Sequence, residues 1–274
     1  MTEIAPFLQQ LETESYAVCD LPNPQAVLEV REILEGWLRE LTSVADITLE
    51  TYHHHLDDDD AHLRVHERIA ERARERRLNR HILLGQLELL HTLFGPDVAM
   101  TCRDNYRIVR PGKEVDNLGY HRDSDYGNSA YELNFLIPLV DVDARSGLQV
   151  MPKSHLLEEN ELVLEQVKHP TITAGSVRHQ LGFMHTPKII KNLDTAKLVA
   201  PAVKIGQALT FVPHCIHGQI VNRGDITRWS TDMEVCNALA PIQWKTTSGQ
   251  PRFEILTQSF FMREGRRKHP ETAS

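Results

Sequence analysis

The pattern of apolar and polar positions changes once along the chain, near Gly95. Before that point it is mostly helical, except for a short alternating stretch, "ESYAVCDL", that predicts a strand. The clearest predicted helix, "NPQAVLEVREILEGWLREL", has an apolar stripe and begins with Asn23 as N-cap and Pro24 at the first helical position. A second helical segment runs from Asp58 to about Phe94, where Gly95 stops it.

After Gly95 the chain reads as short apolar runs separated by glycine, proline, asparagine and aspartate. The predicted strands lie in "VAMTCRDNYRIVRPG", "AYELNFLIPLVDV", "GLQVMPKSH", "QALTFVP", "IHGQIVN" and "TRWSTDMEVCNAL". We therefore expect a mainly β protein with flanking α-helices. Residues 1–274 are expected to form one domain, with a largely helical part (1–95) packed on a β core (96–262). The stretch 155–201 is long enough to suggest a functional loop or lid.

Composition narrows the class of protein. A chain of 274 residues, 41% hydrophobic and 25% charged, can bury the core of one enzyme-sized domain. Its net charge of -8 argues against a nucleic-acid partner. The four cysteines form no CxxC pair, and no apolar run approaches membrane-spanning length. We expect a cytoplasmic protein that handles a small molecule away from the membrane; the sequence does not indicate an oligomeric state.

The stretch "GYHRDSD", residues 119–125, contains the first candidate chemistry. Alternate side chains share a face in an extended chain, so His121, Asp123 and Asp125 could point the same way. Two histidines and one carboxylate suit an iron(II) that must also bind a co-substrate and oxygen, because they leave several positions open. His121 and Asp123 could supply two of these ligands, although the same residues also occur in ordinary polar loops.

A third ligand must come from a distant strand. The candidates are His155, His179, His185, His214 and His217. The neighbourhood of His217 is the richest, because Arg228 follows on a new strand. Alternation places Arg228 and Ser230 on one face of that strand, where a guanidinium and a hydroxyl could hold a carboxylate. His214 is the main rival for His217.

Four segments in order, "GYHRDSDYG", "ELNFLIPLVDV", "GLQVMPKSH" and "HGQIVNRGDITRWSTD", resemble the iron(II)/2-oxoglutarate-dependent dioxygenases, particularly the phytanoyl-CoA-hydroxylase-like branch. The resemblance covers roughly residues 100–240. It implies a double-stranded β-helix, a cupin-like jelly-roll core. It also implies His121, Asp123 and His217 as iron ligands, with Arg228 pairing with the far carboxylate of 2-oxoglutarate. His217 is preferred to His214 because Gly218 follows it and Arg228 is placed as in that family.

Other residues are candidates for contacts around this centre. Ser230, Asn134 and Tyr106 are expected to bind 2-oxoglutarate if they face inward. Asp125 and His155 are possible substrate contacts. No catalytic residue is predicted beyond the metal site. Trp229 lies on the strand face opposite Arg228 and is expected to pack against an outer helix.

Two other charged stretches have simpler explanations. "HHHLDDDD", residues 53–60, has metal-binding residue types, but acids that precede a helix favour its dipole, so a solvated loop is the better interpretation. "RVHERIAERARERR" interleaves arginines with glutamates at helical spacing, which predicts an exposed, ion-paired helix face rather than a nucleic-acid contact.

The predicted function is hydroxylation of an unactivated carbon of a small molecule with Fe(II), 2-oxoglutarate and O2, which forms succinate and CO2. Secondary metabolism, or carbohydrate or aminoglycoside metabolism, is the expected setting. Aspartate at position 123, where glycine or alanine would leave room for a halide, favours hydroxylation over halogenation. Desaturation, epimerisation and cyclisation use the same ligands and stay open, as does the substrate.

Two alternatives use the same scaffold. One is a cupin-like metal-dependent enzyme that does not use 2-oxoglutarate, and the other is a non-catalytic ligand-sensing protein. Arg228 separates the first alternative from the main hypothesis, because only a keto-diacid requires a buried cation there.

Overall fold

The computed structural model describes residues 4–103, 105–117, 119–166, 176–181, 183, 188–219, 221–246, 249–260 and 262–263. Its α-helices are α1 (Ile4–Glu14), α2 (Gln25–Thr42), α3 (Asp59–Arg76), α4 (Leu78–Leu84), α5 (Leu87–Phe94) and α6 (Val177–Gln180). Short 3-10 helices lie at η1 (Tyr52–His54), η2 (Glu114–Asp116), η3 (Asp123–Tyr126), η4 (Ser154–Leu156), η5 (Glu159–Glu161) and η6 (Thr195–Lys197).

The predicted helical segment after Asp58 is divided into three helices. Asp58 accepts a hydrogen bond from the backbone N–H of Ala61 at 2.8 Å and caps α3. Arg77 then adopts a left-handed conformation, with φ of 55°, which ends α3 and redirects the chain into α4. Gly95 ends α5 with φ of 75°, as its position in the sequence predicted.

The predicted start of α2 is corrected by one residue. The helix begins at Gln25, and the preceding Pro24 makes no side-chain cap. Asn23 does not cap the helix. Its backbone N–H instead donates to the Gln86 side chain at 3.0 Å, and this hydrogen bond connects the start of α2 to the residue that precedes α5.

The strands form one large antiparallel sheet and two small ones. They are β1 (Tyr16–Asp20), β2 (Val98–Thr101), β3 (Asn105–Val109), β4 (Glu132–Pro138), β5 (Leu148–Val150), β6 (Leu164–Gln166), β7 (Lys188–Ile190), β8 (Gln207–Phe211), β9 (His217–Gln219), β10 (Arg228–Asn237) and β11 (Phe253–Thr257). The large sheet has the order β1-β8-β4-β10-β2-β11, with β3 also paired to β10. The small sheets pair β5 with β9 and β6 with β7. A mainly antiparallel β fold with flanking helices is thus confirmed.

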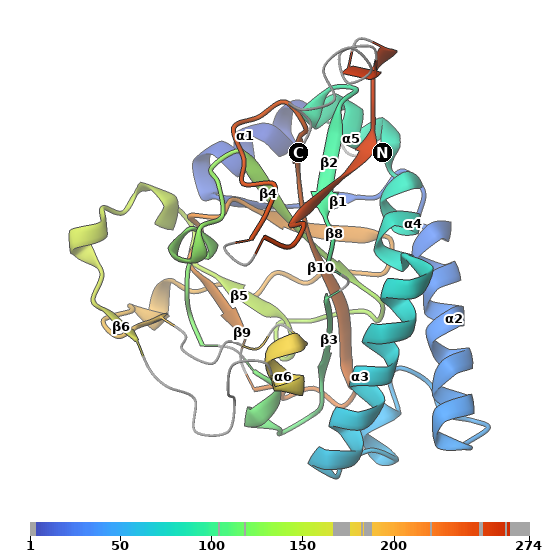
Figure 1. The fold of residues 1–274 in the computed structure, drawn as a ribbon. Helices are drawn as coiled ribbons and strands as arrows, with labels where there is room; N and C mark the ends of the chain where they lie inside the picture. Colours follow the sequence, from blue (N-terminus) through green and yellow to red (C-terminus); the bar gives the residue numbers. More distant parts are fainter. Residues whose placement is uncertain are drawn as a thin grey trace.

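One face of the large sheet packs against the helices. Figure 1 shows α2, α3 and α4 on one side of the sheet and β5 and β9 on the other. On the helix side, Phe135 and Ile137 of β4 join Leu34 of α2 in one buried cluster. On the other side, Leu136 of β4 packs with Leu148 of β5. Alternation along β4 therefore supplies both cores.

Strand β10 alternates in the same way. Trp229 is fully buried on the helix side, where its ring meets Tyr52 edge-on at 5.3 Å between centroids. Thr231 on the same side donates to the Asn79 side chain of α4 at 2.8 Å. Alternation turns Arg228 and the residues at every second position after it toward β5 and β9. The expected packing of Trp229 toward the helical layer is confirmed.

No helix in the described part of the chain is both long enough and apolar enough to cross a membrane.

We expect Trp229→Ala to lower the free energy of unfolding by about 3–5 kcal/mol, because it leaves a large cavity between sheet and helices. Leu84→Ala on α4, where the side chain is 42% exposed, serves as control and should change it far less. Urea denaturation followed by circular dichroism measures both. Equal stability of Trp229→Ala and the wild type would contradict this account of the core.

Candidate metal centre

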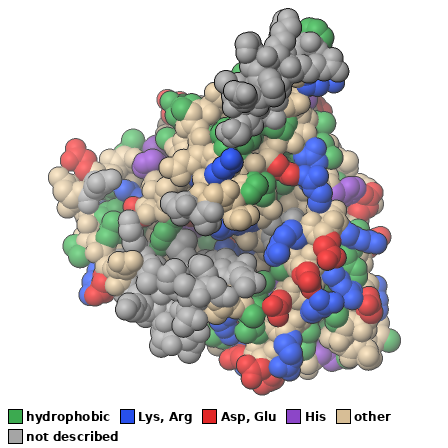
Figure 2. Space-filling model, in the orientation of Figure 1, with side chains coloured by type: hydrophobic (Ala, Val, Ile, Leu, Met, Phe, Trp, Pro, Cys, Tyr) green, Lys and Arg blue, Asp and Glu red, His purple; other side chains and the backbone are tan. Residues whose placement is uncertain are grey.

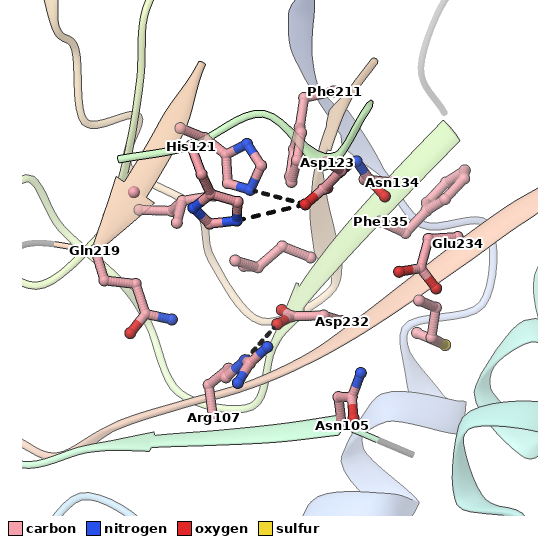
Figure 3. A pocket seen from close by; sticks show the side chains of 15 residues that line it. Asn105, Arg107, His121, Asp123, Asn134, Phe135, Phe211, Gln219, Asp232 and Glu234 are labelled. Carbon is pink, nitrogen blue, oxygen red and sulfur yellow. Dashed lines mark hydrogen bonds and ion pairs between the residues drawn. The ribbon is translucent and has the colours of Figure 1, made fainter. Parts of the chain in front are cut away.

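Two histidines and an aspartate converge between the sheets. His121 and His217 are joined by reciprocal backbone hydrogen bonds of 2.9 and 3.0 Å, which bring together two parts of the chain that are distant in sequence. Nε2 of His121 lies 3.4 Å, and Nε2 of His217 lies 3.6 Å, from Oδ1 of Asp123 (Figure 3). One ligand atom from each residue falls within 4.8 Å of the others, and among the described residues only this group could hold a metal ion.

Backbone carbonyls fix the orientation of both imidazoles. Nδ1 of His121 lies 2.8 Å from the carbonyl oxygen of Gly119, and Nδ1 of His217 lies 3.0 Å from that of Cys215. A carbonyl can only accept, so each Nδ1 carries a proton and donates it. The lone pair of each Nε2 then faces Asp123, which is the tautomer that a metal ligand needs.

Asp123 is held as an ionised ligand. Its Oδ2 accepts a hydrogen bond from Nδ2 of Asn134 at 2.8 Å, while Oδ1 faces the histidines. Burial raises the pKa of Asp123, but His217 and His121 outweigh that effect and lower it to about 2. Burial lowers the pKa of His217 and so favours the neutral ligand form. At His121 burial acts in the same direction, but the Asp123 carboxylate outweighs it and the pKa is raised.

The donor set fits iron(II). Two neutral imidazole nitrogens and one carboxylate oxygen approach from one side, as in the two-histidine, one-carboxylate arrangement of non-haem iron oxygenases. All three residues also line a cavity, so the remaining coordination positions would face a space that small molecules can enter.

Gly218 allows the two histidine-bearing segments to approach each other. A Cβ atom at this position would lie 2.6 Å from Cδ1 and 3.0 Å from Cα of Tyr120. Contacts this short require the backbone beside His121 to shift. The glycine after His217 is therefore explained by close packing at the metal centre.

The space beside the metal centre, counted together with the open solvent at its mouth, amounts to about 570 Å³. Its walls are polar on β3 and β10 and more apolar on β4, β5 and β8 (Figure 3). They consist of Asn105, Arg107, His121, Asp123, Asn134, Phe135, Leu136, Leu148, Phe211, His217, Gly218, Gln219, Asp232, Met233 and Glu234.

Arg228 is a buried cation without a counter-ion in the described part of the chain. It is 1% exposed, and its Nη1 donates to the carbonyl of Ser146 at 3.2 Å. Nη2 donates to the side-chain oxygen of Gln219 at 3.0 Å when that amide is oriented to satisfy both of its neighbours. No described carboxylate lies within 4.0 Å, and Nε has no hydrogen-bond partner there. Burial lowers the pKa of Arg228 to about 10, which still leaves it charged at neutral pH.

Ser230 follows on the same face of β10. It is fully buried, and its hydroxyl has no hydrogen-bond partner among the described residues. Buried polar groups are normally satisfied, so an uncompensated guanidinium beside an unpartnered hydroxyl indicates a polar, anionic ligand. Arg228 does not itself line the cavity, but its partner Gln219 does.

Two predicted co-substrate contacts are placed differently by the structure. Asn134 faces the cavity, but its side-chain amide is engaged by Asp123. Tyr106 pairs directly with Thr231, so it lies on the helix-facing side of the sheet and does not line the cavity. The neighbours of Tyr106 on β3, Asn105 and Arg107, face the cavity instead.

The predicted substrate contacts and rival ligands also lie elsewhere. His155 directs Nε2 to the carbonyl of Glu12 at 2.9 Å, and Asp125 lies within η3; neither lines the cavity. His214 is exposed. The side chain of His179 and the whole of His185 lie outside the described residues.

Sequence reasoning missed five polar residues of the cavity: Asn105, Arg107, Gln219, Asp232 and Glu234. The sequence does indicate an inward position for Asp232 and Glu234, because the alternation that places Arg228 and Ser230 inward continues along "RWSTDME". Arg107 lies opposite Ser230 through the pairing of β3 with β10, a register that no sequence pattern indicates.

Fold and site together define a non-haem iron oxygenase of the 2-oxoglutarate-dependent class. The model of the phytanoyl-CoA dioxygenase family matches residues 16–230. The chain therefore belongs to the phytanoyl-CoA dioxygenase family, an enzyme family that uses iron and 2-oxoglutarate. No curated protein sequence gives a significant match.

Several solved structures share the fold. EvdO2 from Micromonospora carbonacea var. aurantiaca, complexed with 2-oxoglutarate, aligns with a TM-score of 0.53 and 12% identity over 89% of this chain and 96% of its own. Apo ThoJ, a non-heme monooxygenase, aligns with a TM-score of 0.52 and 16% identity over 92% and 83%. The epimerase SnoN, with Fe3+, alpha ketoglutarate and nogalamycin RO, aligns with a TM-score of 0.50 and 16% identity over 92% and 98%.

We expect Asn134→Ala to weaken iron(II) binding by roughly tenfold to a hundredfold, because Asp123 loses the hydrogen bond that orients it. Anaerobic titration with iron(II) measures the affinity. Asn192→Ala, an exposed asparagine outside the cavity, is the matched control and should bind iron(II) like the wild type. An unchanged affinity in Asn134→Ala would show that this hydrogen bond does not support the metal ligand.

Proposed function

We propose that this enzyme hydroxylates an unactivated carbon of a small molecule and converts 2-oxoglutarate and O2 to succinate and CO2. His121, Asp123 and His217 would hold the iron. Arg228 and Ser230 would bind the carboxylate of 2-oxoglutarate that is remote from the metal. When bound, iron and 2-oxoglutarate supply the oxidising power for the reaction, while the chain supplies binding, orientation and exclusion of water.

One observation supports this proposal most strongly: a buried group of two histidines and one carboxylate shares an interior with Arg228, a buried arginine for which the described residues supply no counter-ion. The first group leaves coordination positions toward the cavity. The second needs an anion, because an uncompensated guanidinium in a protein interior is costly. A molecule that chelates through one end and is anionic at the other satisfies both requirements, as 2-oxoglutarate does.

The surrounding residues have distinct proposed roles. Asn134 keeps Oδ2 of Asp123 occupied and directs Oδ1 to the metal. The Ser146 carbonyl and the Gln219 amide orient the Arg228 guanidinium without neutralising it. Gln219 lines the cavity and also contacts Arg228. We therefore expect its side chain to move when 2-oxoglutarate binds to Arg228.

Apolar walls would protect the reacting centre from water. Phe211 lies against the His217 ring with 4.5 Å between ring centroids, and Leu136 and Leu148 line the same cavity. These side chains cannot donate or accept hydrogen bonds. They therefore lower the local polarity beside the metal, which strengthens electrostatic contacts to a bound co-substrate.

The fold that we propose is a double-stranded β-helix. The large sheet and the β5–β9 pair lie on opposite sides of the cavity, and the likeness to EvdO2 supports that interpretation. Reaction type is a separate question, because ThoJ is a monooxygenase and SnoN an epimerase on a similar fold. Aspartate at position 123 favours hydroxylation, and SnoN complexed with nogalamycin RO is consistent with secondary metabolism as the setting.

We expect His121→Ala and Asp123→Ala to lower iron-dependent succinate formation by at least about a hundredfold, because each removes one of three protein ligands. Conversion of 2-oxoglutarate to succinate, with iron(II), oxygen and a broad small-molecule panel, measures the effect. His214→Ala changes an exposed histidine near His217 and is the control. Normal turnover by either ligand variant would refute the assignment of the metal centre.

Arg228→Gln should weaken 2-oxoglutarate binding by about 2–5 kcal/mol, and Arg228→Lys should be intermediate because lysine keeps the charge without the planar fork. Calorimetric titration of the iron-loaded protein measures this. Iron(II) affinity serves as the internal control and should be unchanged. Tight 2-oxoglutarate binding by Arg228→Gln would contradict the role assigned to Arg228. Failure of the wild type to bind 2-oxoglutarate would favour the alternative of a metal-dependent enzyme that does not use this keto-acid.

A further inference from the structure

The inward face of β10 has two chemically different ends. Arg228 and Ser230 form the first end, and alternation places Asp232 and Glu234 farther along the same face. Both carboxylates line the cavity, and in Figure 3 they lie across it from the metal-ligand group. At about 3.4 Å per residue, Arg228 and Glu234 are about 20 Å apart along the strand.

Asp232 is only partly satisfied. Its Oδ2 accepts from Nε of Arg107 at 2.8 Å, so this pair is close to neutral. Its Oδ1 is buried and has no hydrogen-bond partner among the described residues. Asn105 pairs directly with Asp232 across the strands and also lines the cavity. A donor from a ligand would complete this group.

Glu234 forms no ion pair with the described residues, although Arg252 and Arg103 act on its charge from a greater distance. No described cation lies within 4.0 Å of its carboxylate, and the Thr101 hydroxyl is its hydrogen-bonding neighbour. The nearby Arg252 is engaged by Glu132 at 2.7 Å. Burial raises the pKa of Glu234, as expected for a carboxylate whose charge is poorly compensated.

Glu234 is also close to the metal centre. It pairs directly with Asn134 across β10 and β4, and Asn134 donates to Asp123. Directly opposed residues in an antiparallel sheet have Cβ atoms about 4.5–5.5 Å apart. A small molecule anchored at Glu234 would therefore extend toward the open side of the metal.

We propose that Glu234, assisted by Asp232 and Asn105, binds a protonated amine of the substrate and so presents a neighbouring carbon to the metal. This inference rests on the proposed function, because it names the substrate class of the same cavity. An ammonium group matches the charge of Glu234 and donates to the unpartnered oxygen of Asp232. A neutral alcohol would satisfy the hydrogen bonds but leave the charge of Glu234 uncompensated.

The same charges disfavour anions at this end of the cavity. The carboxylate of 2-oxoglutarate that is remote from the metal would be repelled by Glu234 and attracted to Arg228, so the two ends of the strand face favour ligands of opposite charge. A CoA thioester, which carries several anionic groups, would be a poor ligand for this wall.

Three matched sugars test the inference: glucosamine, glucose and glucuronate present an amine, a hydroxyl or a carboxylate on similar rings. Their dissociation constants are measured by NMR titration against protein loaded with iron(II) and 2-oxoglutarate under anaerobic conditions. We expect glucosamine to bind at least about tenfold more tightly than glucose, and glucuronate to bind most weakly. Glu234→Gln should abolish the preference for the amine, while Glu234→Asp, which keeps the charge, should retain part of it.

Glu88→Gln, which removes an exposed carboxylate of α5, controls for net charge and should keep the wild-type preference. Equal binding of glucosamine and glucose, no binding of glucosamine, or a preference that survives Glu234→Gln would each overturn the amine site. Calorimetry with 2-oxoglutarate separates the two proposals. If the wild type fails to bind 2-oxoglutarate, the proposed function fails; if it binds 2-oxoglutarate but shows no amine preference, only the amine site fails.

Discussion

The backbone pairing of His121 with His217 is the interaction on which the site depends. Its two hydrogen bonds join the segment before η3 to the start of β9 and place the two imidazole rings 4.4 Å apart between centroids. The carbonyls of Gly119 and Cys215, which set the tautomers, belong to the same two segments. Because the backbone supplies both the approach and the orientation of the two imidazoles, these two ligands are preorganised, while the Asn134 side chain orients Asp123.

Strand β10 contributes residues to the hydrophobic core on one face and to the cavity on the other. Its outward residues, such as Trp229, hold the helices on the sheet, and its inward residues range from a cation to two carboxylates. The inward residues of β3 and β4 meet them in register, so Arg107 neutralises Asp232 while Asn134 supports Asp123. The site is thus assembled from neighbouring strands of one sheet and closed by β9, which accounts for its position beside the apolar interior.

Much of the fold could be predicted from the sequence, because alternation and helix stops are local signals. The metal triad was predicted through the resemblance to the dioxygenases, because the residues alone left the third ligand open. The break at Arg77 could not be predicted, since nothing in the sequence marks that arginine for a left-handed conformation. Tyr106 was a candidate only if it faced inward, and its actual face is fixed by pairing with Thr231, which is a property of the assembled sheet. The contacts of His155 and the ion pair of Arg107 likewise depend on distant partners. Alternation along β10 places Asp232 and Glu234 on one face, but the proposed amine site also needs the pairing of β10 with β3 and β4, which the sequence does not indicate.

The alternation of β10 has a further consequence for errors of strand register during folding. A slip of one residue in the pairing of this strand would carry Trp229 into the cavity and Arg228 into the helical core. For this enzyme the hydrophobic core and the charges of the cavity consequently depend on the same strand register. Chains with the wrong register would lose their hydrophobic core together with the charged groups of the cavity. A stably folded chain with an incorrectly charged cavity is therefore not expected to accumulate.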